Sequence, residues 1–383
     1  MTPAARIAAA IEVLDQVLEG TAAEKALLGW ARRSRFAGSK DRAALRDIVF
    51  QCLRCRRSYA AMGGSLTGRG LVRGFMSDTG TPEADIFGAT RHAPPVLDDP
   101  PLTPWDNLSE GDQADLQDWV YDRLCAEYGS QARMIAQALR QQAPIWLRVN
   151  AQRTDSAAVS RNLSDAGFEI QASKDVPTAL QVTRPARGLA NLDAAQAGLF
   201  EFQDLSSQRA IAALGDLHGV RVLDFCAGGG GKALAMAAAG ASVTAHDRDP
   251  RRMKDFSERA KRAQVHINTS SLADLKGQSF DLVVCDVPCS GSGAWRRSLE
   301  TKWTLTPTDL TDLIDLQRGI AQTAVGFMKP EGRLSYMTCS LFSAENAEQA
   351  EWIDAHLPVS KTLAHQMIPL DGGDGFFVSI YQG

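Results

Sequence analysis

Short runs of apolar residues alternate with longer stretches of helical spacing through the second half of the chain. Each apolar run is too short for a helix and is rich in β-branched or aromatic side chains, which indicates a buried strand. The runs lie at 220–225, 241–245, 265–269, 280–286 and 333–338. Because helical segments separate these runs, we expect an α/β fold with a mainly parallel sheet.

The same pattern divides the chain into regions. Apolar residues recur at helical spacing near the N-terminus, which predicts an all-helical domain at 1–66. Gly, Pro, Thr and Asp dominate 67–105, as is typical of a linker, within which we expect one or two short helices around Leu71 to Met76 and Pro82 to Phe87. Short helices and strands alternate over 106–205, so we expect a small α+β domain there, and the α/β pattern occupies 206–383.

The composition of the chain indicates the cellular compartment more clearly than it indicates the function. The 383 residues contain no apolar run of about 18 residues, and the N-terminus lacks the layout of a signal peptide. Seven cysteines are scattered without disulfide spacing, which fits a reducing compartment. We therefore expect a cytoplasmic protein without a membrane segment. No second Cys or His pair accompanies Cys52 and Cys55, so these two indicate core packing and no metal site.

Basic residues gather in the N-terminal region although the net charge of the chain is −4. The cluster comprises Arg32, Arg33, Arg35, Lys40, Arg42, Arg46, Arg54, Arg56 and Arg57. A solvated helix face explains many such runs. In an acidic chain, however, a local basic run favours contact with an RNA backbone.

The stretch from Val220 to Ala239 carries the first chemical signal. A predicted strand ends near Asp224, four glycines at 228–231 follow, and a helix begins at once. Backbone amides at such a turn can bind an anionic group at the helix N-terminus. The spacing fits neither the G-x-G-x-x-G nor the phosphate-loop pattern well, whereas D-x-x-x-G-x-G resembles the S-adenosylmethionine turn of class I methyltransferases. Asp247 ends the next predicted strand, where an acidic residue commonly binds ribose.

Two cysteines mark the ends of two further strands. Asp286, Pro288 and Cys289 follow one strand, and Cys339 follows another. A single cysteine would most simply be core, but two at the ligand-binding edge of a sheet indicate chemistry. Methylation of cytosine at carbon 5 needs this arrangement, because a thiolate must first add to carbon 6. Asp286 is the natural candidate for hydrogen bonding at the pyrimidine nitrogen.

At these residues the sequence resembles the Nol1/Nop2/Sun group of RNA cytosine-5 methyltransferases, nearest to the RsmB type that acts on 16S ribosomal RNA. Three motifs carry the resemblance: VLDFCAGGGGKALAMAA, FDLVVCDVPCSGSGAWRR and SYMTCSLFSAENAEQ. It implies a class I, Rossmann-like methyltransferase domain after an α+β domain and a NusB-like helical RNA-binding domain. A monomer that binds RNA and S-adenosylmethionine, without a metal, is expected.

The resemblance also implies roles for single residues. Cys339 would be the nucleophile, Cys289 would assist product release, Asp286 would face the cytosine and Lys232 would lie near donor and base. The residues expected to bind S-adenosylmethionine are Asp224, Cys226, Ala227, Gly228, Gly229, Gly230, Lys232, Asp247, Arg252 and Asp286. The family usually has Ala-Pro-Gly-Gly at the turn, and its Asp near the adenine is replaced by Thr269, Ser270 or a displaced Asp274.

Other functions remain as alternatives. The RNA could be a tRNA instead of 16S rRNA. A small-molecule or protein methyltransferase would share the glycine turn but has no use for both cysteines. A DNA methyltransferase would use Cys289 as its nucleophile. A ribosome-assembly factor could bind RNA and donor without turnover.

Overall fold

The computed structural model describes residues 1–184 and 187–383, and these form two compact units. The first unit contains Met1–Gln142 together with Trp295–Thr304, and the second contains Ala143–Ala294 with Leu305–Gly383. The chain therefore crosses between the units three times. No described helix is long and apolar enough to span a membrane.

The first unit is helical, as expected, but it extends well beyond residue 66. Its core contains Leu14, Leu45, Tyr59 and Leu71, all fully buried. Its helices are α1 (Pro3–Leu18), α2 (Ala23–Arg33), α3 (Ser39–Arg54), α4 (Arg56–Gly63), α5 (Gly68–Asp78), η1 (Glu83–Asp85), η2 (Trp105–Asn107), α6 (Glu110–Ala114), α7 (Asp118–Tyr128), η3 (Gly129–Gln131), α8 (Ala132–Leu139) and α14 (Leu299–Thr304).

Helix α5 lies inside the stretch that the sequence predicted to be mainly linker. Its glycines serve close packing. A Cβ on Gly74 would lie 2.3 Å from the carbonyl oxygen of Tyr59, and one on Gly70 would lie 2.1 Å from that of Ser65. The backbones of α4 and α5 can touch only because these side chains are absent. The helical unit therefore continues through α5 to Gln142, whereas the composition predicted that it ends at residue 66.

The segment Trp295–Thr304 packs within the helical unit although it follows the Pro-Cys motif in the chain. The Lys302 ammonium donates to the carbonyl oxygen of Arg54 at 2.8 Å, and the Trp303 indole N–H donates to that of Leu53 at 2.8 Å. Leu299 belongs to the same apolar core as Leu14 and Leu45. These contacts make the segment an integral part of the first unit.

The second unit contains a seven-stranded sheet in the order β10-β11-β9-β8-β5-β6-β7. Strands β9, β8, β5, β6 and β7 are parallel, whereas β11 pairs antiparallel with both β9 and β10. The strands are β5 (Arg221–Asp224), β6 (Ser242–Ala245), β7 (Ile267–Thr269), β8 (Phe280–Asp286), β9 (Met328–Thr338), β10 (Ser360–Met367) and β11 (Phe376–Gln382). This confirms the predicted Rossmann-like α/β fold.

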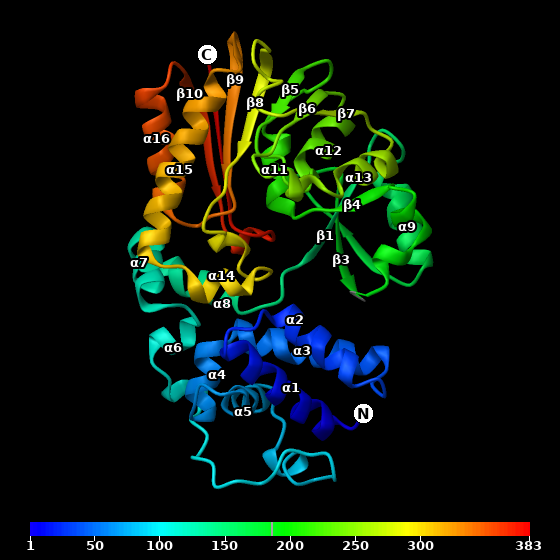
Figure 1. The fold of residues 1–383 in the computed structure, drawn as a ribbon, viewed down its shortest axis with the longest axis vertical. Helices are drawn as coiled ribbons and strands as arrows, with labels where there is room; N and C mark the ends of the chain where they lie inside the picture. Colours follow the sequence, from blue (N-terminus) through cyan, green and yellow to red (C-terminus); the bar gives the residue numbers. More distant parts are fainter. Residues whose placement is uncertain (185–186) are drawn as a thin grey trace. The chain divides into compact units, whose positions relative to one another are not determined.

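Helices cover both faces of this sheet (Figure 1). Val222 packs with α12 on one face, while its neighbour Leu223 packs with α15 on the other. Successive side chains of a strand point to opposite faces, so a strand buried on both sides is apolar throughout. The helices are α11 (Leu205–Ala212), α12 (Gly231–Ala238), η5 (Pro250–Met253), α13 (Phe256–Ala263), η6 (Ser292–Ala294), α15 (Pro307–Val325), η7 (Ser343–Glu345), α16 (Ala347–His356) and η8 (Pro369–Asp371).

A four-stranded antiparallel sheet in the order β2-β3-β1-β4 completes the second unit. It lies inside the 106–205 region for which the sequence predicted a small α+β domain, but the first part of that region, up to Gln142, belongs to the helical unit. Asn150, which follows β1, donates to the carbonyl oxygen of Ala263 at 2.8 Å and so joins this part to α13. The elements are β1 (Ile145–Val149), α9 (Ser156–Asp165), β2 (Glu169–Ala172), β3 (Ala179–Arg184), η4 (Leu189–Asn191), α10 (Asp193–Gln196) and β4 (Phe200–Phe202).

Candidate active site

The predicted glycine turn joins β5 to α12. Gly228 and Gly230 have φ angles of 51° and 82°, in the left-handed region that glycine tolerates best. A Cβ on Gly230 would lie 2.4 Å from the ring of Phe256, so no larger residue fits without movement. Gly230 is also the N-cap residue of α12, which leaves the first amides of the helix at the carboxyl edge of the sheet.

Asp247 fastens this turn to the end of β6. Its carboxylate accepts the backbone N–H of Gly228 at 2.8 Å and that of Asp249 at 2.9 Å. The Arg252 guanidinium lies 3.3 Å from the same carboxylate. Asp247 is buried, and these three donors hold its carboxylate in one position. Sequence reasoning placed Asp247 and Arg252 at one site, and the structure brings them together.

A cavity of about 910 Å³ opens beside Asp247 at the carboxyl ends of the parallel strands. Of the predicted donor-binding residues, Cys226, Asp247 and Arg252 line it. The other predicted residues lie outside its lining: Asp224, Ala227, Gly228, Gly229, Gly230, Lys232 and Asp286. Pro288 also lines the cavity, which brings the Pro-Cys loop to its edge.

The three candidates for the position near the adenine differ in their relation to this cavity. Thr269 and Ser270 line it, whereas Asp274 does not. The Asp274 carboxylate instead accepts the hydroxyl of Ser271 at 2.6 Å. Sequence reasoning missed several lining residues: Phe225, His246, Met253, Phe256, Leu316, Gly319 and Ile320. Those on α15 carry no motif, so only the fold could reveal them.

Asp224 lies beneath the turn and is 1% exposed. Neither of its carboxylate oxygens has a hydrogen-bond partner among the described residues. Burial, aided by the negative charge of Asp286, raises the pKa of Asp224 to about 7. It is therefore a buried acid close to protonation at neutral pH, placed under the site instead of on its surface.

The two strand-end cysteines meet. Cys289 Sγ and Cys339 Sγ lie 3.4 Å apart, within hydrogen-bond distance for thiols. They are adjacent because β8 and β9 are parallel neighbours, with Asp286 opposite Met337 in the register. The hydrogen bond to Cys339, together with burial, raises the pKa of Cys289 well above its usual value. Cys289 is therefore a protonated thiol at neutral pH.

Lys232 and Asp286 form an ion pair at the same place. The ammonium nitrogen of Lys232 lies 2.6 Å from a carboxylate oxygen of Asp286 and 5.0 Å from the ring centroid of Phe376. Burial alone would lower the pKa of Lys232, but the charge and hydrogen bond of Asp286 outweigh it and raise that pKa. Lys232 is consequently a permanent cation beside the cysteines.

The buried carboxylate of Glu345 was not among the predicted site residues, although it follows the Thr-Cys motif. It accepts hydrogen bonds from the Ser290 backbone N–H at 2.8 Å and from the Gln317 side chain at 2.9 Å. The hydroxyls of Ser290 and Ser340 also donate to it. The Glu-Asn pair that follows Thr-Cys in the motif SYMTCSLFSAENAEQ was the available signal.

Cys52 and Cys55 lie in the core of the helical unit. Both side chains are fully buried, and their thiols donate to the carbonyl oxygens of Leu71 and Arg140 at 3.8 Å each. The expectation that this pair is core packing is confirmed.

Comparisons with known proteins identify a family for this chain. A family model described as 16S rRNA methyltransferase RsmB/F matches residues 212–380, and an RsmF/B-like, ferredoxin-like domain model matches residues 117–187. Ribosomal RNA small subunit methyltransferase B of Photorhabdus laumondii is 31% identical over 278 residues, which cover 68% of this chain and 64% of that protein. The namesake from Erwinia tasmaniensis is 32% identical over 288 residues, covering 70% and 67%.

A solved structure shares the fold. The crystal structure of a methyltransferase homolog protein from Pyrococcus horikoshii aligns with a TM-score of 0.63 at 23% identity, covering 73% of this chain and 99% of that one. The match to the Photorhabdus protein spans about two thirds of that relative's length. The sequence motifs, the fold and these matches agree that the chain belongs to the RsmB/F family of 16S rRNA methyltransferases.

Proposed function

We propose that this protein methylates carbon 5 of a cytosine in RNA through a covalent bond between Cys339 and the base. The observation that carries the proposal is the 3.4 Å approach of Cys289 and Cys339 beside the Lys232–Asp286 ion pair. A protein that only binds donor or RNA has no need for two thiols and a buried ion pair at one point. Other methyl transfers to nitrogen or oxygen need no nucleophilic cysteine.

Each residue has a role in this reaction. The Cys339 thiolate forms a bond to carbon 6, which makes carbon 5 electron-rich. Lys232, the cation beside this thiol, stabilises the thiolate that attacks. The Asp286 carboxylate accepts a hydrogen bond from the amine of the cytosine and shares a proton with ring nitrogen 3. After methylation a base removes the proton from carbon 5, and the bond from Cys339 to carbon 6 breaks with its electron pair returning to the Cys339 sulfur as thiolate. Cys289 assists this elimination.

S-adenosylmethionine is the cofactor, and it supplies an electrophilic sulfonium methyl group. The residues fit it: Asp247 lines a cavity large enough for a nucleoside, and Phe225, Met253 and Ile320 give that cavity apolar walls. We assign the ribose to Asp247 and the adenine to the part lined by Thr269 and Ser270. We assign the carboxylate of S-adenosylmethionine to the glycine turn, where the backbone N–H groups of the turn and of the N-terminus of α12 can donate to it.

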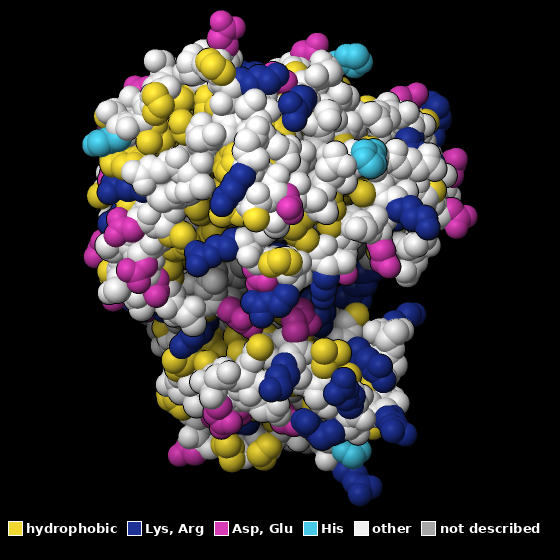
Figure 2. Space-filling view, turned by 45° about the horizontal axis from the view of Figure 1, so that its top comes forward, with side chains coloured by type: hydrophobic (Ala, Val, Ile, Leu, Met, Phe, Trp, Pro, Cys, Tyr) yellow, Lys and Arg dark blue, Asp and Glu magenta, His cyan; other side chains and the backbone are white. Residues whose placement is uncertain are grey.

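We propose 16S rRNA as the substrate, which places the protein in the cytoplasm, because the relatives bear that name and the helical unit offers a basic surface. Figure 2 shows Lys and Arg side chains on the exposed face of this unit. Within this unit, Arg32, Arg35 and Lys40 are exposed. Arg54, in contrast, is buried in the core, so the basic run is only partly available for phosphate contacts.

The test is transfer of labelled methyl groups. The purified protein is incubated with labelled S-adenosylmethionine and with 16S rRNA or tRNA from a strain that lacks the gene. We expect label in 16S rRNA that digests to 5-methylcytidine. Label in tRNA alone would replace the proposed substrate, and label in another nucleoside, or none in any RNA, would overturn the proposed chemistry.

A further inference from the structure

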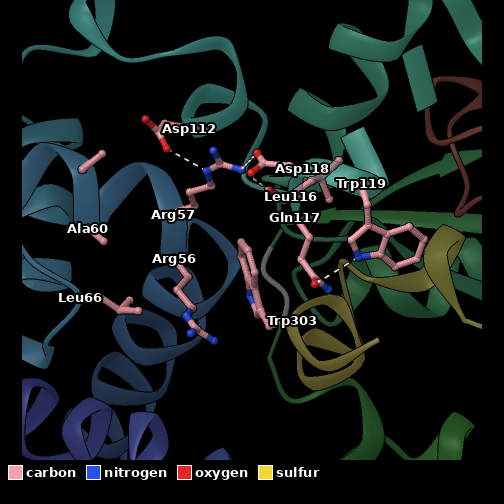
Figure 3. Close-up of a pocket in the computed structure, with 11 residues that line it drawn as sticks. Arg56, Arg57, Ala60, Leu66, Asp112, Leu116, Gln117, Asp118, Trp119 and Trp303 are labelled. Carbon is pink, nitrogen blue, oxygen red and sulfur yellow. Dashed lines mark hydrogen bonds and ion pairs between the residues drawn. The ribbon is translucent and has the colours of Figure 1, made fainter. Parts of the chain in front are cut away.

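A second hollow lies wholly within the helical unit, formed by α4, the start of α7 and the segment that contains α14 (Figure 3). Its volume is about 740 Å³, which accommodates a nucleotide. Arg56, Ala60, Leu66, Leu116 and Trp303 are among the residues that line it. None of these residues belongs to the cysteine site.

Arg56 is the cation of this pocket that is available to pair with an anionic ligand. Its guanidinium makes no ion pair or hydrogen bond with any side chain in the described part of the chain. Arg57 differs, since it is held by Asp112 at 2.8 Å and Asp118 at 2.5 Å. The two carboxylates at the rim are therefore already paired. Burial lowers the pKa of Arg56, as expected for a cation that lacks an anionic partner.

Trp303 supplies an aromatic wall next to this cation. The Arg56 guanidinium carbon lies 5.4 Å from the centroid of the indole ring. The indole N–H donates to the carbonyl oxygen of Leu53, which holds the ring in one orientation. In Figure 3 the ring stands edge-on beside Arg56, and Leu66 lies on the other side of that arginine. A rigid aromatic face beside an unpaired arginine is the combination that binds a base and its phosphate.

We propose that this pocket binds one unpaired nucleotide of the RNA substrate, with the base stacked on Trp303 and the phosphate paired with Arg56. The inference rests on the proposed function, because it assumes an RNA substrate. A stacked base buries an aromatic face without needing a particular sequence, so the pocket contributes affinity and not base identity.

Charge complementarity favours RNA over a peptide as the occupant. The unpaired charge in the pocket is positive, and it lies in the same unit as the exposed Arg32, Arg35 and Lys40. Cations of this kind attract the phosphates of a polyanion more strongly than a peptide of mixed charge. The apolar residues Ala60 and Leu66 complete the wall that a flat base can contact.

The position of Trp303 in the chain adds a reason for the pocket to serve the reaction. Trp303 lies in Trp295–Thr304, the segment that follows Cys289 and returns to the second unit at Leu305. A nucleotide held on Trp303 therefore restrains a segment that is covalently continuous with the Pro-Cys loop.

The test measures binding of a single-stranded RNA of about 12 nucleotides, a length within the range of known single-strand sites. Fluorescence anisotropy of labelled RNA is compared for Arg56→Ala, Trp303→Ala and Trp303→Phe. Arg91→Ala is the matched control, because Arg91 is an exposed cation of the same unit outside the pocket. Thermal unfolding of each variant verifies that it is folded.

We expect Arg56→Ala and Trp303→Ala each to weaken binding about tenfold, whereas Trp303→Phe keeps most of the affinity because it retains an aromatic face. Arg56→Ala should also reduce the dependence of log affinity on log salt by about one, while Trp303→Ala leaves it unchanged. Arg91→Ala should bind within about twofold of the unaltered protein. An RNA of the same length held in a duplex should not distinguish Trp303→Ala from the unaltered protein.

The inference is overturned if Arg56→Ala and Trp303→Ala bind the single strand as tightly as the unaltered protein, as they would if the pocket took a protein segment. It is also overturned if Trp303→Phe loses as much as Trp303→Ala. Methyl transfer by the unaltered protein distinguishes the two hypotheses. Transfer to RNA with unchanged binding of both variants would reject the pocket and leave the proposed function in place.

Discussion

Ser290 donates both its backbone N–H and its hydroxyl to the carboxylate of Glu345, the N–H at 2.8 Å. Ser290 directly follows Cys289. Ser340, which directly follows Cys339, donates its hydroxyl to the same carboxylate. The buried side chain of Glu345 thus joins the two loops that carry the thiols.

Replacing Glu345 should therefore disturb both stability and chemistry. Glu345→Ala leaves buried donors without an acceptor, which we expect to lower the free energy of unfolding by about 3 kcal/mol. Methyl transfer should fall by about 100-fold, because small displacements of reacting groups are costly. Glu345→Gln should have a smaller effect on both. Chemical denaturation and a transfer assay measure the two quantities.

Glu348→Ala is the control for this prediction, since Glu348 is exposed and lies in the same helical region, at the start of α16. It should leave stability and transfer within error of the unaltered protein. Equal activity of Glu345→Ala and Glu348→Ala would show that the carboxylate does not position the thiols.

The prediction that Cys289 and Cys339 follow the ends of neighbouring strands agrees with the structure, but sequence reasoning assigned no role to Glu345. Cys289 and Cys339 are found because each ends an apolar run, and the ends of parallel strands share one edge of a sheet. Glu345 has no such marker. Its role arises from η7, a short turn that returns its side chain beneath both loops, and that return is a tertiary property.

The two cysteines should give different covalent behaviour. Cys339→Ala should abolish methyl transfer and form no adduct, because Cys339 makes the bond to carbon 6. Cys289→Ala should still add to the base and then stall, giving a protein–RNA adduct that survives denaturing electrophoresis and vanishes with ribonuclease. The double variant should form no adduct. The opposite pattern would make Cys289 the nucleophile, as in DNA cytosine methyltransferases.

Asp224 should make stability depend on pH. Its folded-state pKa is about 7, against an ordinary value of 3.8. Between these values the unfolded chain loses a proton that the folded protein keeps, so stability falls as pH rises towards 7 and changes little above it. Asp224→Asn removes this penalty. It should raise the melting temperature by roughly 2–4 °C or more at pH 8 and by much less at pH 4.5.

Asp281 provides a control of opposite sign. A hydrogen bond from Lys329 lowers the pKa of Asp281, so this carboxylate stabilises the fold above its unfolded pKa and loses that effect in acid. Asp281→Asn should lower the melting temperature slightly at pH 8. If Asp224→Asn had the same effect at pH 4.5 and pH 8, Asp224 would not be a buried acid with a raised pKa.

The limits of the helical unit could not be predicted from local composition. The glycines of α5 looked like a linker, because composition does not distinguish a glycine in a loop from one where two helix backbones touch. Similarly, Leu299, Lys302 and Trp303 follow a catalytic motif in the chain, and nothing local indicates that they complete a core formed by the first residues. Both features depend on contacts between distant segments.

Removing residues 1–142 should therefore destabilise what remains. The truncated protein keeps Trp295–Thr304 but lacks the helices that bury it, so it exposes Leu299 and Trp303 and frees the Lys302 ammonium from the Arg54 carbonyl. An exposed apolar segment promotes aggregation. We expect strong binding of a hydrophobic dye and a low melting temperature for residues 143–383.

A second truncated form tests the cause, because in it a flexible Gly-Ser linker replaces residues 295–304. It should bind less dye and remain monomeric at higher concentration than the simple truncation, since the exposed apolar side chains are gone. Its cavity beside Asp247 consists entirely of residues from the second unit, so its affinity for S-adenosylmethionine should stay within a few-fold of that of the full chain. If the simple truncation were as soluble and as stable as the linker form, the segment would not depend on the helical unit for its burial.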